Sequence, residues 1–319
     1  MIKSVNQLVT AKCNSKCKNC SIWQSKDFSD EMLPQEFKEL YSKQQFREVE
    51  DLCISGGEPT MRRDLVQIMN EILPSIPKLN ILFLSSNASY PDRVLEFLKK
   101  CSDKIKDVYA CLSLEGDRQT HKLLRGVDTY NSVVYTLEKI QQLDIPNIHS
   151  IISTTLSSEN CDKKSLEHIR DIANRTGSTH SFRPVTVNDT FYKNTECGCS
   201  SLSIAQAEVM RSYISQYKND DPFLKILCDF IDNKPTVMGD RKTGIKCLAG
   251  DISVLIQPDG KIFPCINSKR QIGDKKQGVY EFEYLLGDKE LCPCCTECQV
   301  YPMLNFAKYG TRLKSGGKQ

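Results

Sequence analysis

Residues 13–20 read Cys-Asn-Ser-Lys-Cys-Lys-Asn-Cys, which places Cys13, Cys17 and Cys20 within eight positions. Three thiolates at this spacing can bind three irons of a cubane iron–sulfur cluster and leave the fourth iron open to another ligand, whereas four would make a closed electron-transfer site. Zinc is the alternative, but a structural zinc site needs four ligands and no histidine lies nearby. The stretch therefore predicts redox or radical chemistry.

The chain has 319 residues and 16 cysteines, which cluster at residues 13–20 and 247–298. No export signal precedes the first cluster and no apolar stretch is long enough to span a membrane, so we expect a soluble, cytoplasmic protein. In a reducing compartment, clustered cysteines indicate metal ligands rather than disulfides. The net charge of +3 comes from acidic and basic residues mixed along the chain, which disfavours a nucleic-acid-binding protein.

From Ser4 to about Val185, short apolar runs alternate with longer amphipathic stretches. Six strands alternating with five helices predict right-handed βαβ units and a parallel sheet, an α/β fold. Because ligands of such sheets bind outside the carboxyl ends of the strands, the cysteine loop after the first strand should lie at the active end. The predicted strands are 5–10, 52–55, 81–85, 108–114, 148–154 and 181–185, and the predicted helices are 34–44, 64–73, 92–100, 130–143 and 164–176.

The pattern divides the chain into four parts. Residues 1–185 form the α/β core, and residues 186–246 form a connecting segment with a helix that begins near Ser203. Residues 247–306 form a small module with a hairpin at Pro258-Asp259-Gly260, and the polar residues 307–319 are expected to be a disordered tail. A module this small buries little apolar area, so a metal or cluster should stabilise it.

Residues 55–59, Ser-Gly-Gly-Glu-Pro, follow the second predicted strand and resemble the GGEP motif of the radical S-adenosylmethionine (radical SAM) superfamily. The spacing C-x3-C-x2-C of the cysteine loop is the signature of that family. Its GGEP backbone and glutamate hold the methionine amino group, which is chemically reasonable because glycine permits close backbone approach and a carboxylate pairs with an ammonium. The resemblance implies this role for Gly56, Gly57, Glu58 and Pro59.

Further segments at strand ends resemble the same family. Residues 85–87, Ser-Ser-Asn, stand where Thr-Asn-Gly is usual, and residues 113–116, Ser-Leu-Glu-Gly, resemble its Ser-x-Asp-Gly segment. Residues 121–126 resemble a His-x3–4-Arg-Gly stretch common in one branch. The cofactor contacts that the resemblance implies are Ser86, Asn87, Ser113 and Glu115, with Arg183 for a carboxylate of cofactor or substrate.

Three positions depart from the family pattern. Asn19 stands where an aromatic residue usually packs near the adenine, and Trp23 is either its replacement or a core residue. Ala88 replaces a glycine, and Glu115 replaces an aspartate. These changes alter detail rather than identity.

The resemblance implies a partial (β/α)6 barrel in which Cys13, Cys17 and Cys20 bind a 4Fe–4S cluster and S-adenosylmethionine chelates the fourth iron. One electron, from a donor of the flavodoxin or ferredoxin type, would cleave the carbon–sulfur bond. The resulting 5′-deoxyadenosyl radical would remove a hydrogen from the substrate, while the protein positions the substrate and excludes water.

The C-terminal cysteines resemble the SPASM and twitch auxiliary-cluster domains, of which the shorter twitch form is the better match. They imply a second 4Fe–4S cluster, with zinc as the alternative. Among the other cysteines, two in a polar segment, Cys197 and Cys199, are candidate redox or hydrogen-donor thiols, and the rest are expected to act as small buried hydrophobes. The predicted auxiliary ligands are Cys247, Cys265, Cys295 and Cys298, with Cys292 or Cys294 as alternates.

Two kinds of radical SAM substrate remain open. The first is a small metabolite or sugar-like molecule that is dehydrogenated, epimerised or rearranged. The second is a ribosomally made peptide that gains a thioether, a carbon–carbon link or an epimerised residue, although Cys13 comes too early to leave room for a leader-binding domain. A zinc-stabilised binding protein without enzymatic activity is the third reading.

Overall fold

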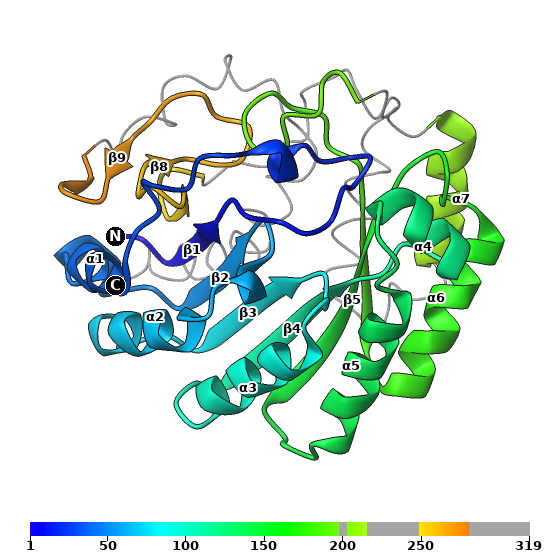
Figure 1. Ribbon diagram of the computed structural model, residues 1–319, viewed down its shortest axis with the longest axis horizontal. Coiled ribbons are helices and arrows are strands. Elements are labelled where there is room, and N and C mark those ends of the chain that lie inside the picture. Colours follow the sequence, from blue (N-terminus) through cyan, green and yellow to red (C-terminus); the bar gives the residue numbers. More distant parts are fainter. Residues whose placement is uncertain (198–202, 216–248, 281–319) are drawn as a thin grey trace, which may run out of the picture.

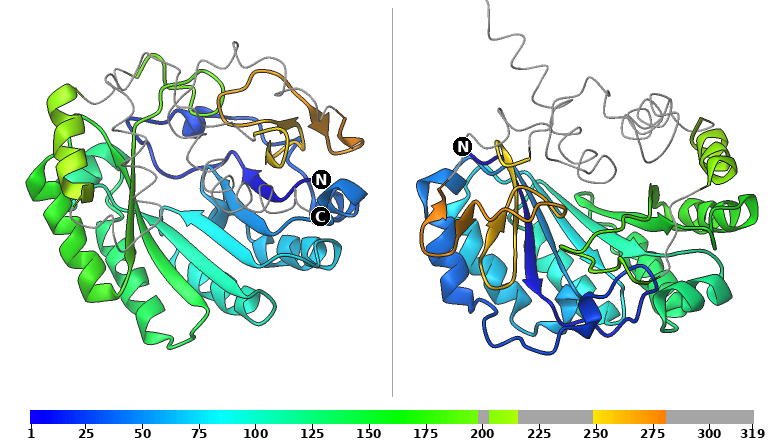
Figure 2. Two further views of the ribbon diagram at one scale, coloured as in Figure 1. Left: turned by 180° about the vertical axis from the view of Figure 1, so that it is seen from behind. Right: turned by 90° about the horizontal axis from the view of Figure 1, so that it is seen from above.

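The computed structural model describes residues 1–197, 203–215 and 249–280 (Figure 1). Their strands form a ten-stranded sheet in the order β10-β9-β8-β7-β1-β2-β3-β4-β5-β6, and the helices lie along its outer side (Figures 1 and 2). The strands are β1 (Ser4–Thr10), β2 (Asp51–Gly56), β3 (Ile81–Ser86), β4 (Asp107–Ser113), β5 (Ile148–Leu156), β6 (Thr179–Pro184), β7 (Ser253–Ile256), β8 (Ile262–Phe263), β9 (Gly273–Asp274) and β10 (Gly278–Val279).

Strands β1 to β6 are parallel and follow one another in chain order. This confirms the predicted α/β fold with a parallel sheet. The helices are α1 (Pro34–Tyr41), α2 (Leu65–Ile72), α3 (Pro91–Ser102), α4 (Arg118–Arg125), α5 (Tyr130–Gln142), α6 (Lys163–Thr176) and α7 (Ile204–Ser215), with short 3-10 turns at Ile22–Gln24, Gln44–Phe46, Pro59–Met61 and Leu73–Ser75.

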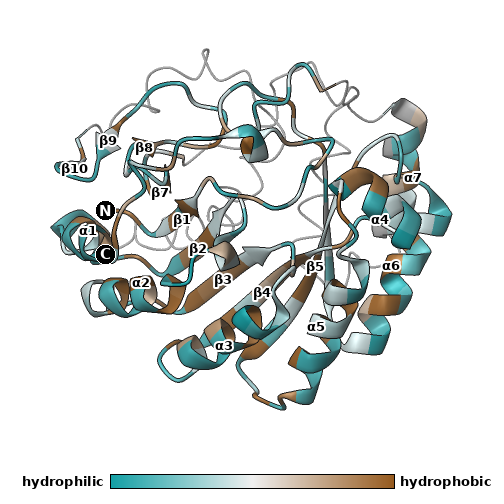
Figure 3. Cartoon of the chain, viewed as in Figure 1, coloured by the Kyte–Doolittle hydropathy of each residue, from teal (hydrophilic) through white to brown (hydrophobic). Residues whose placement is uncertain are grey.

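The core lies between the sheet and the helices. Side chains of β3, β4 and β5 alternate strictly between buried and half-buried, because successive residues of a strand point to opposite faces. The buried set, such as Leu84 and Leu112, packs against helix residues such as Phe97 and Leu137. Apolar residues are accordingly concentrated in the strands, and the outer surfaces of the helices are largely hydrophilic (Figure 3). The half-buried set faces the barrel interior.

Helix α4 was not among the predicted helices. It buries only His121 and Leu124, so its apolar pattern is too sparse to indicate a helix. Its ends nevertheless carry sequence signals: the Asp117 carboxylate accepts a hydrogen bond from the Thr120 amide, and Gly126 adopts a left-handed φ of 68°. The first helix also differs from the prediction, since α1 ends at Tyr41 and a 3-10 turn follows.

The predicted hairpin at Pro258-Asp259-Gly260 is confirmed, because β7 and β8 pair in antiparallel fashion. Strand β7 also pairs in parallel with β1, from Ser4↔Ser253 to Gln7↔Ile256, so the hairpin extends the core sheet. The tail at 307–319 and several predicted cysteines lie outside the described residues: Cys199, Cys228, Cys247, Cys292, Cys294, Cys295 and Cys298. None of the helices in the described ranges is both long and apolar enough to cross a bilayer.

Candidate active site

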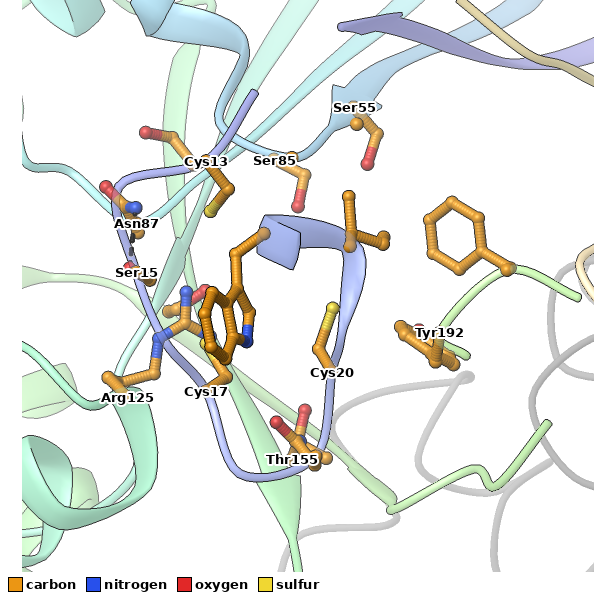
Figure 4. Close-up of a pocket in the computed structure, with 18 of the residues that line it drawn as sticks. Cys13, Ser15, Cys17, Cys20, Ser55, Ser85, Asn87, Arg125, Thr155 and Tyr192 are labelled. Carbon is orange, nitrogen blue, oxygen red and sulfur yellow. Dashed lines mark hydrogen bonds between the residues drawn. The ribbon is translucent and has the colours of Figure 1, made fainter. Parts of the chain in front are cut away.

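A pocket at the carboxyl ends of the parallel strands gathers most of the predicted site residues (Figure 4). The predicted residues that line it are Cys13, Cys17, Cys20, Gly56, Gly57, Ser86, Asn87, Ser113 and Arg183. Glu58, Pro59 and Glu115 are buried and do not belong to the lining. Cys197 is exposed and Cys265 half-buried, and both lie outside the pocket.

The cysteine loop is fixed at its start by the turn after β2. The amide of Gly57 donates to the Thr10 carbonyl at 2.8 Å, and the amide of Glu58 donates to the Lys12 carbonyl at 2.7 Å. A Cβ on Gly56 would lie 2.3 Å from the Thr10 oxygen, and a Cβ on Gly57 would lie 2.3 Å from the Lys12 oxygen. The two glycines are therefore required by the backbone of the loop itself, which is a reason distinct from their predicted contact with a cofactor.

The same loop is fixed at its centre by the end of α4. The Lys16 amide donates to the Arg125 carbonyl at 2.9 Å, and the Lys18 amide donates to the Leu124 carbonyl at 2.9 Å. A Cβ on Gly126 would lie 2.4 Å from the Lys16 oxygen, so this glycine also admits the loop. The loop thus satisfies carbonyl groups that a helix end leaves unpaired, and the helix orients the cysteines.

Glu58 ties two strand ends together. One carboxylate oxygen accepts hydrogen bonds from the Thr60 amide at 3.1 Å, from its hydroxyl and from the Ser86 hydroxyl at 2.8 Å. The other oxygen accepts from the Asn87 amide at 2.7 Å. The Asn87 side-chain amide then donates to Ser15 in the cysteine loop at 2.9 Å. Protein donors occupy both oxygens, so the contact of Glu58 with a methionine ammonium stays a prediction.

Arg125 and Glu115 form a buried pair beside the cysteines. The Arg125 Nη1 atom donates to Glu115 Oε1 at 3.4 Å, and the Thr155 amide donates to Glu115 Oε2 at 2.8 Å. Burial raises the pKa of the Glu115 carboxyl, and the Arg125 charge opposes that rise. His121 supports this arrangement: its Nδ1 accepts from the Glu115 amide at 3.3 Å, and burial lowers its pKa to about 3, so it is neutral. The contact of Glu115 with the cofactor stays a prediction.

The three cysteine thiols are crowded and largely buried. Burial, with a smaller contribution from the neighbouring thiols, raises the pKa of Cys13 to about 11 and that of Cys20 to about 12. Burial also raises the pKa of Cys17, while Arg125 opposes the rise at all three. As bare thiols they would stay protonated at neutral pH, so metal binding there must release protons.

Two buried donors in the pocket wall have no hydrogen-bond partner among the described residues, the Nε1 group of Trp23 and the Nε group of Arg125. A buried donor without a partner is costly, so a ligand acceptor is expected to meet them. The same ranges hold no three His, Cys, Asp or Glu side chains that could surround one metal ion. A cubane cluster does not need such a group, because each cysteine binds a different iron. The donor set therefore fits an anionic cluster with a carboxylate-bearing ligand.

The loop after β6 completes the pocket with residues that sequence reasoning did not identify. Its Tyr192 carbonyl accepts from the Ser21 amide at 2.7 Å, and the Asn194 side chain donates to the Asn19 carbonyl at 2.8 Å. On this loop Thr186, Phe191 and Tyr192 line the pocket. From other segments, Ser15, Ser55, Ser85, Arg125 and Thr155 also line it. The hydroxyls at the strand ends follow a simple signal, since polar residues there face the ligand side of a parallel sheet. The aromatic pair lies on a loop and carries no such signal.

The other cysteines in the described ranges are partly as predicted. Cys53, Cys101 and Cys161 are buried, as expected, and the Cys161 thiol also donates to the Gln206 carbonyl at 3.3 Å. Cys111 is half-buried on a strand position that faces the barrel interior. Cys197 is too far out to line the pocket, so its role as a hydrogen donor stays a prediction.

The steric demand at Gly57 gives a first test. Gly57→Ala is expected to displace the cysteine loop, with a loss of stability of about 1–3 kcal/mol and a fall in bound iron. Gly177→Ala is the control, because a Cβ there would meet only Gln141 at 3.7 Å although its φ is +61°. That change should cost about 1 kcal/mol and leave the iron content unchanged. Urea unfolding and iron analysis measure both quantities, and equal iron loss in the two variants would contradict the argument.

Together, the parallel half-barrel and the cysteine-lined pocket at its carboxyl edge define an enzyme of the cluster-dependent radical type. The sequence profile of the Radical SAM superfamily matches residues 8–172, 165 of the 319 residues. The chain belongs to the radical SAM superfamily. It is therefore an enzyme, and the family implies a 4Fe–4S cluster and S-adenosylmethionine as cofactors.

Curated relatives match only part of the chain. A probable GTP 3′,8-cyclase of Pyrococcus abyssi (strain GE5 / Orsay) is 28% identical over 140 residues, 43% of each protein. An Fe-coproporphyrin III synthase of Methanosarcina barkeri (strain Fusaro / DSM 804) is 32% identical over 124 residues, 37% of this chain and 29% of the relative. The chain thus matches less than half the length of these relatives.

Two solved structures share the fold. Streptococcus suis SuiB bound to S-adenosylmethionine has a TM-score of 0.66 at 13% identity, covering 91% of this chain and 66% of that one. The enzyme anSMEcpe with bound AdoMet and Cp18Cys peptide has a TM-score of 0.60 at 16% identity, covering 98% of each chain. At these identities the likeness confirms the partial-barrel fold alone.

Proposed function

We propose that this pocket reductively cleaves S-adenosylmethionine and that Cys13, Cys17 and Cys20 bind the cluster. The observation that carries the proposal is that all three thiols, set on one loop, line a single pocket with the partnerless donors of Trp23 and Arg125. When bound, the cluster and S-adenosylmethionine supply one-electron cleavage of a carbon–sulfur bond and a 5′-deoxyadenosyl radical.

The protein's own residues would hold and orient these groups. Arg125 lies beside the thiols, where its charge offsets the negative charge of three thiolates. Its free Nε group and the Trp23 indole offer donors to a ligand carboxylate or to acceptors of the nucleoside. The hydroxyls of Ser55, Ser85 and Ser113 come from three successive strands and can hold ribose or substrate hydroxyls. The aromatic loop after β6 limits the access of water to the pocket.

For the substrate, we propose a small metabolite that is dehydrogenated, epimerised or rearranged. The sequence relatives are named for reactions of small molecules, GTP and a coproporphyrin, and the pocket wall carries hydroxyls and the Arg183 guanidinium. A peptide is the second candidate, because SuiB was solved with its precursor peptide SuiA and anSMEcpe with the Cp18Cys peptide. Those are statements about the two neighbours, whose likeness concerns the fold.

An auxiliary cluster also belongs to the proposal. Of its predicted ligands, Cys265 lies within the described residues, in a segment fixed to the loop after β6. The Asn188 side chain donates to Asn267 at 2.6 Å, and the Thr190 hydroxyl donates to the Ile266 carbonyl. This places the Cys265 segment against the same loop that contacts the N-terminal cysteines. This contact supports the proposal that the auxiliary-cluster module, to which Cys265 belongs, packs beside the pocket.

Anaerobic reconstitution tests the proposal directly. The protein should turn brown, absorb near about 400 nm and hold about eight irons per chain if both clusters form, or about four if one forms. Dithionite and S-adenosylmethionine should then yield 5′-deoxyadenosine, detected by mass spectrometry. Colourless protein that holds zinc and makes no 5′-deoxyadenosine would instead support a zinc-stabilised binding protein.

Two substitutions at Trp23 distinguish the role of its indole N–H from that of its aromatic ring. Trp23→Phe removes the donor and should weaken S-adenosylmethionine binding about fivefold to tenfold, the value of one hydrogen bond. Trp23→Ala also removes the aromatic surface and should weaken it further. Equilibrium binding to the iron-loaded protein measures both, with the exposed Tyr135→Phe on α5 as the control. If all three variants bind as tightly as the parent, Trp23 is a packing residue.

A further inference from the structure

The cysteine loop carries lysines between its cysteines. Cys17 lines the pocket, and its two neighbours in the sequence, Lys16 and Lys18, are both exposed. Consecutive Cα atoms lie about 3.8 Å apart, so exposed residues lie one position along the chain from a thiol that lines the pocket. This is a short route from the outside of the protein to a group bound by Cys17.

The last turn of α4 adjoins the same lysines. The backbone hydrogen bonds of Lys16 and Lys18 to α4 hold the two segments together, as the contact of the loop with α4 in Figure 1 shows. Lys122 is exposed on this turn, and the adjacent Leu123 exposes 53% of its surface. We call the surface formed by Lys16, Lys18, Lys122 and Leu123 the lysine face. It combines an exposed apolar side chain with positive charges around it.

Acidic neighbours neutralise only part of this charge. Lys18 lies 3.7 Å from Glu159, and Lys122 helps to lower the pKa of Asp128, whose ion pair is with Arg118. Neither Lys16 nor Lys122 forms an ion pair of its own with any described residue. A lysine near a helix C-terminus is ordinary in itself, because it complements the helix dipole. That reason applies to Lys122 but not to the two lysines of the loop. An exposed leucine among lysines whose charge is only partly neutralised is instead typical of a surface that meets a negatively charged protein.

We propose that the lysine face docks an acidic one-electron donor protein of the flavodoxin or ferredoxin type. The inference rests on the proposed function, which needs one electron at the cysteine loop for each cleavage. Electron tunnelling slows steeply with distance, so the donor must dock where the protein wall is thin. On docking, the donor loses one electron and the cluster gains one, with no atom transferred. The lysines steer the donor, and Leu123 gives a small apolar contact, as in transient redox complexes.

Charge reversal tests the face on the iron-loaded enzyme. We compare Lys16→Glu/Lys122→Glu with the matched control Lys99→Glu/Lys100→Glu, which reverses two exposed lysines of α3. Formation of 5′-deoxyadenosine is driven either by dithionite or by a reduced acidic flavodoxin. With flavodoxin, the first variant should lose at least about tenfold in kcat/KM for the donor, while the control matches the parent. With dithionite, all three should be equal.

Salt gives a second readout. Raising the ionic strength shortens the screening length, which is about 10 Å at 0.1 M, so the flavodoxin-driven rate of the parent should fall and that of the reversed variant should change little. If reversal lowers the iron content, the neutral pair Lys16→Gln/Lys122→Gln is measured instead, with a smaller loss in the same direction. A reversed variant that accepts flavodoxin electrons as fast as the parent overturns the docking proposal. A parent that makes no 5′-deoxyadenosine with dithionite overturns the proposed function itself.

Discussion

Cys17→Ala is expected to abolish 5′-deoxyadenosine formation and to remove about four irons per chain. Cys17 is the central thiol of the triad and lines the pocket beside Arg125. Two thiolates cannot hold a cubane cluster and also leave one defined iron open to S-adenosylmethionine, so both cofactor sites should be lost together. Iron analysis and mass spectrometry of the dithionite-driven reaction measure the two effects, and Cys13→Ala and Cys20→Ala should behave in the same way.

Cys101→Ala is the matched control for this experiment. Cys101 is buried in the core on α3, on the opposite side of the sheet from the pocket, with 2% of its surface exposed. Its loss should cost about 1 kcal/mol of stability through the small cavity that it leaves. Iron content and 5′-deoxyadenosine formation should not change. Undiminished cleavage in Cys17→Ala would show that the triad does not hold the cluster.

The parallel sheet could be predicted because its signal is local. Short apolar runs such as 81–85 and 108–114 predicted strands, and each predicted strand was found within a few residues of its expected limits. The cluster-binding motif could be predicted for the same reason, because Cys13, Cys17 and Cys20 lie within eight consecutive residues. Helix α4 was not predicted because it buries too few apolar residues to give a helical period. Its N-cap Asp117 and its C-terminal Gly126 were nevertheless present as signals in the sequence.

Much of the pocket could not be predicted because it depends on contacts between distant segments. Nothing in the spacing of residues 186–197 indicates that Tyr192 meets Ser21, since that contact joins loops about 170 residues apart in the sequence. The buried carboxylates of Glu58 and Glu115 are a second example. The cofactor contacts that the motif resemblance implies for Glu58 and Glu115 stay predictions. The sequence did not indicate the protein donors that the structure gives both carboxylates, which a buried carboxylate needs wherever it lies. The strand ends are thus predictable from sequence, and the partners of their buried charges are not.

The second large effect is expected from Arg125→Gln. Arg125 is the charged partner of the buried Glu115 carboxylate, and it also lies beside the three thiols. Removing one member of a buried pair leaves the other uncompensated, at a cost of about 3–5 kcal/mol. Loss of S-adenosylmethionine binding should accompany this, because the pocket loses its buried cation. Arg118→Gln on the same helix is the control: Arg118 pairs with Asp128 at the surface, so its removal should change stability little.

The pH dependence distinguishes loss of the pair from a general packing defect. Burial raises the pKa of Glu115 in the folded protein, and without Arg125 the pKa should rise further. A carboxyl with a raised folded pKa binds more protons when folded, so stability falls as the pH rises from the unfolded value, about 4.3, up to the folded pKa. Within that window the slope is about 1.4 kcal/mol per pH unit. The stability of Arg125→Gln, measured by urea unfolding at matched iron content, should therefore fall as the pH is raised from about 4.3, and it should stop falling once the pH has passed the folded pKa of Glu115. The double variant Arg125→Gln/Glu115→Gln has no carboxyl to ionise, so its stability should lack this slope, and a slope that persists there would mean that another group titrates.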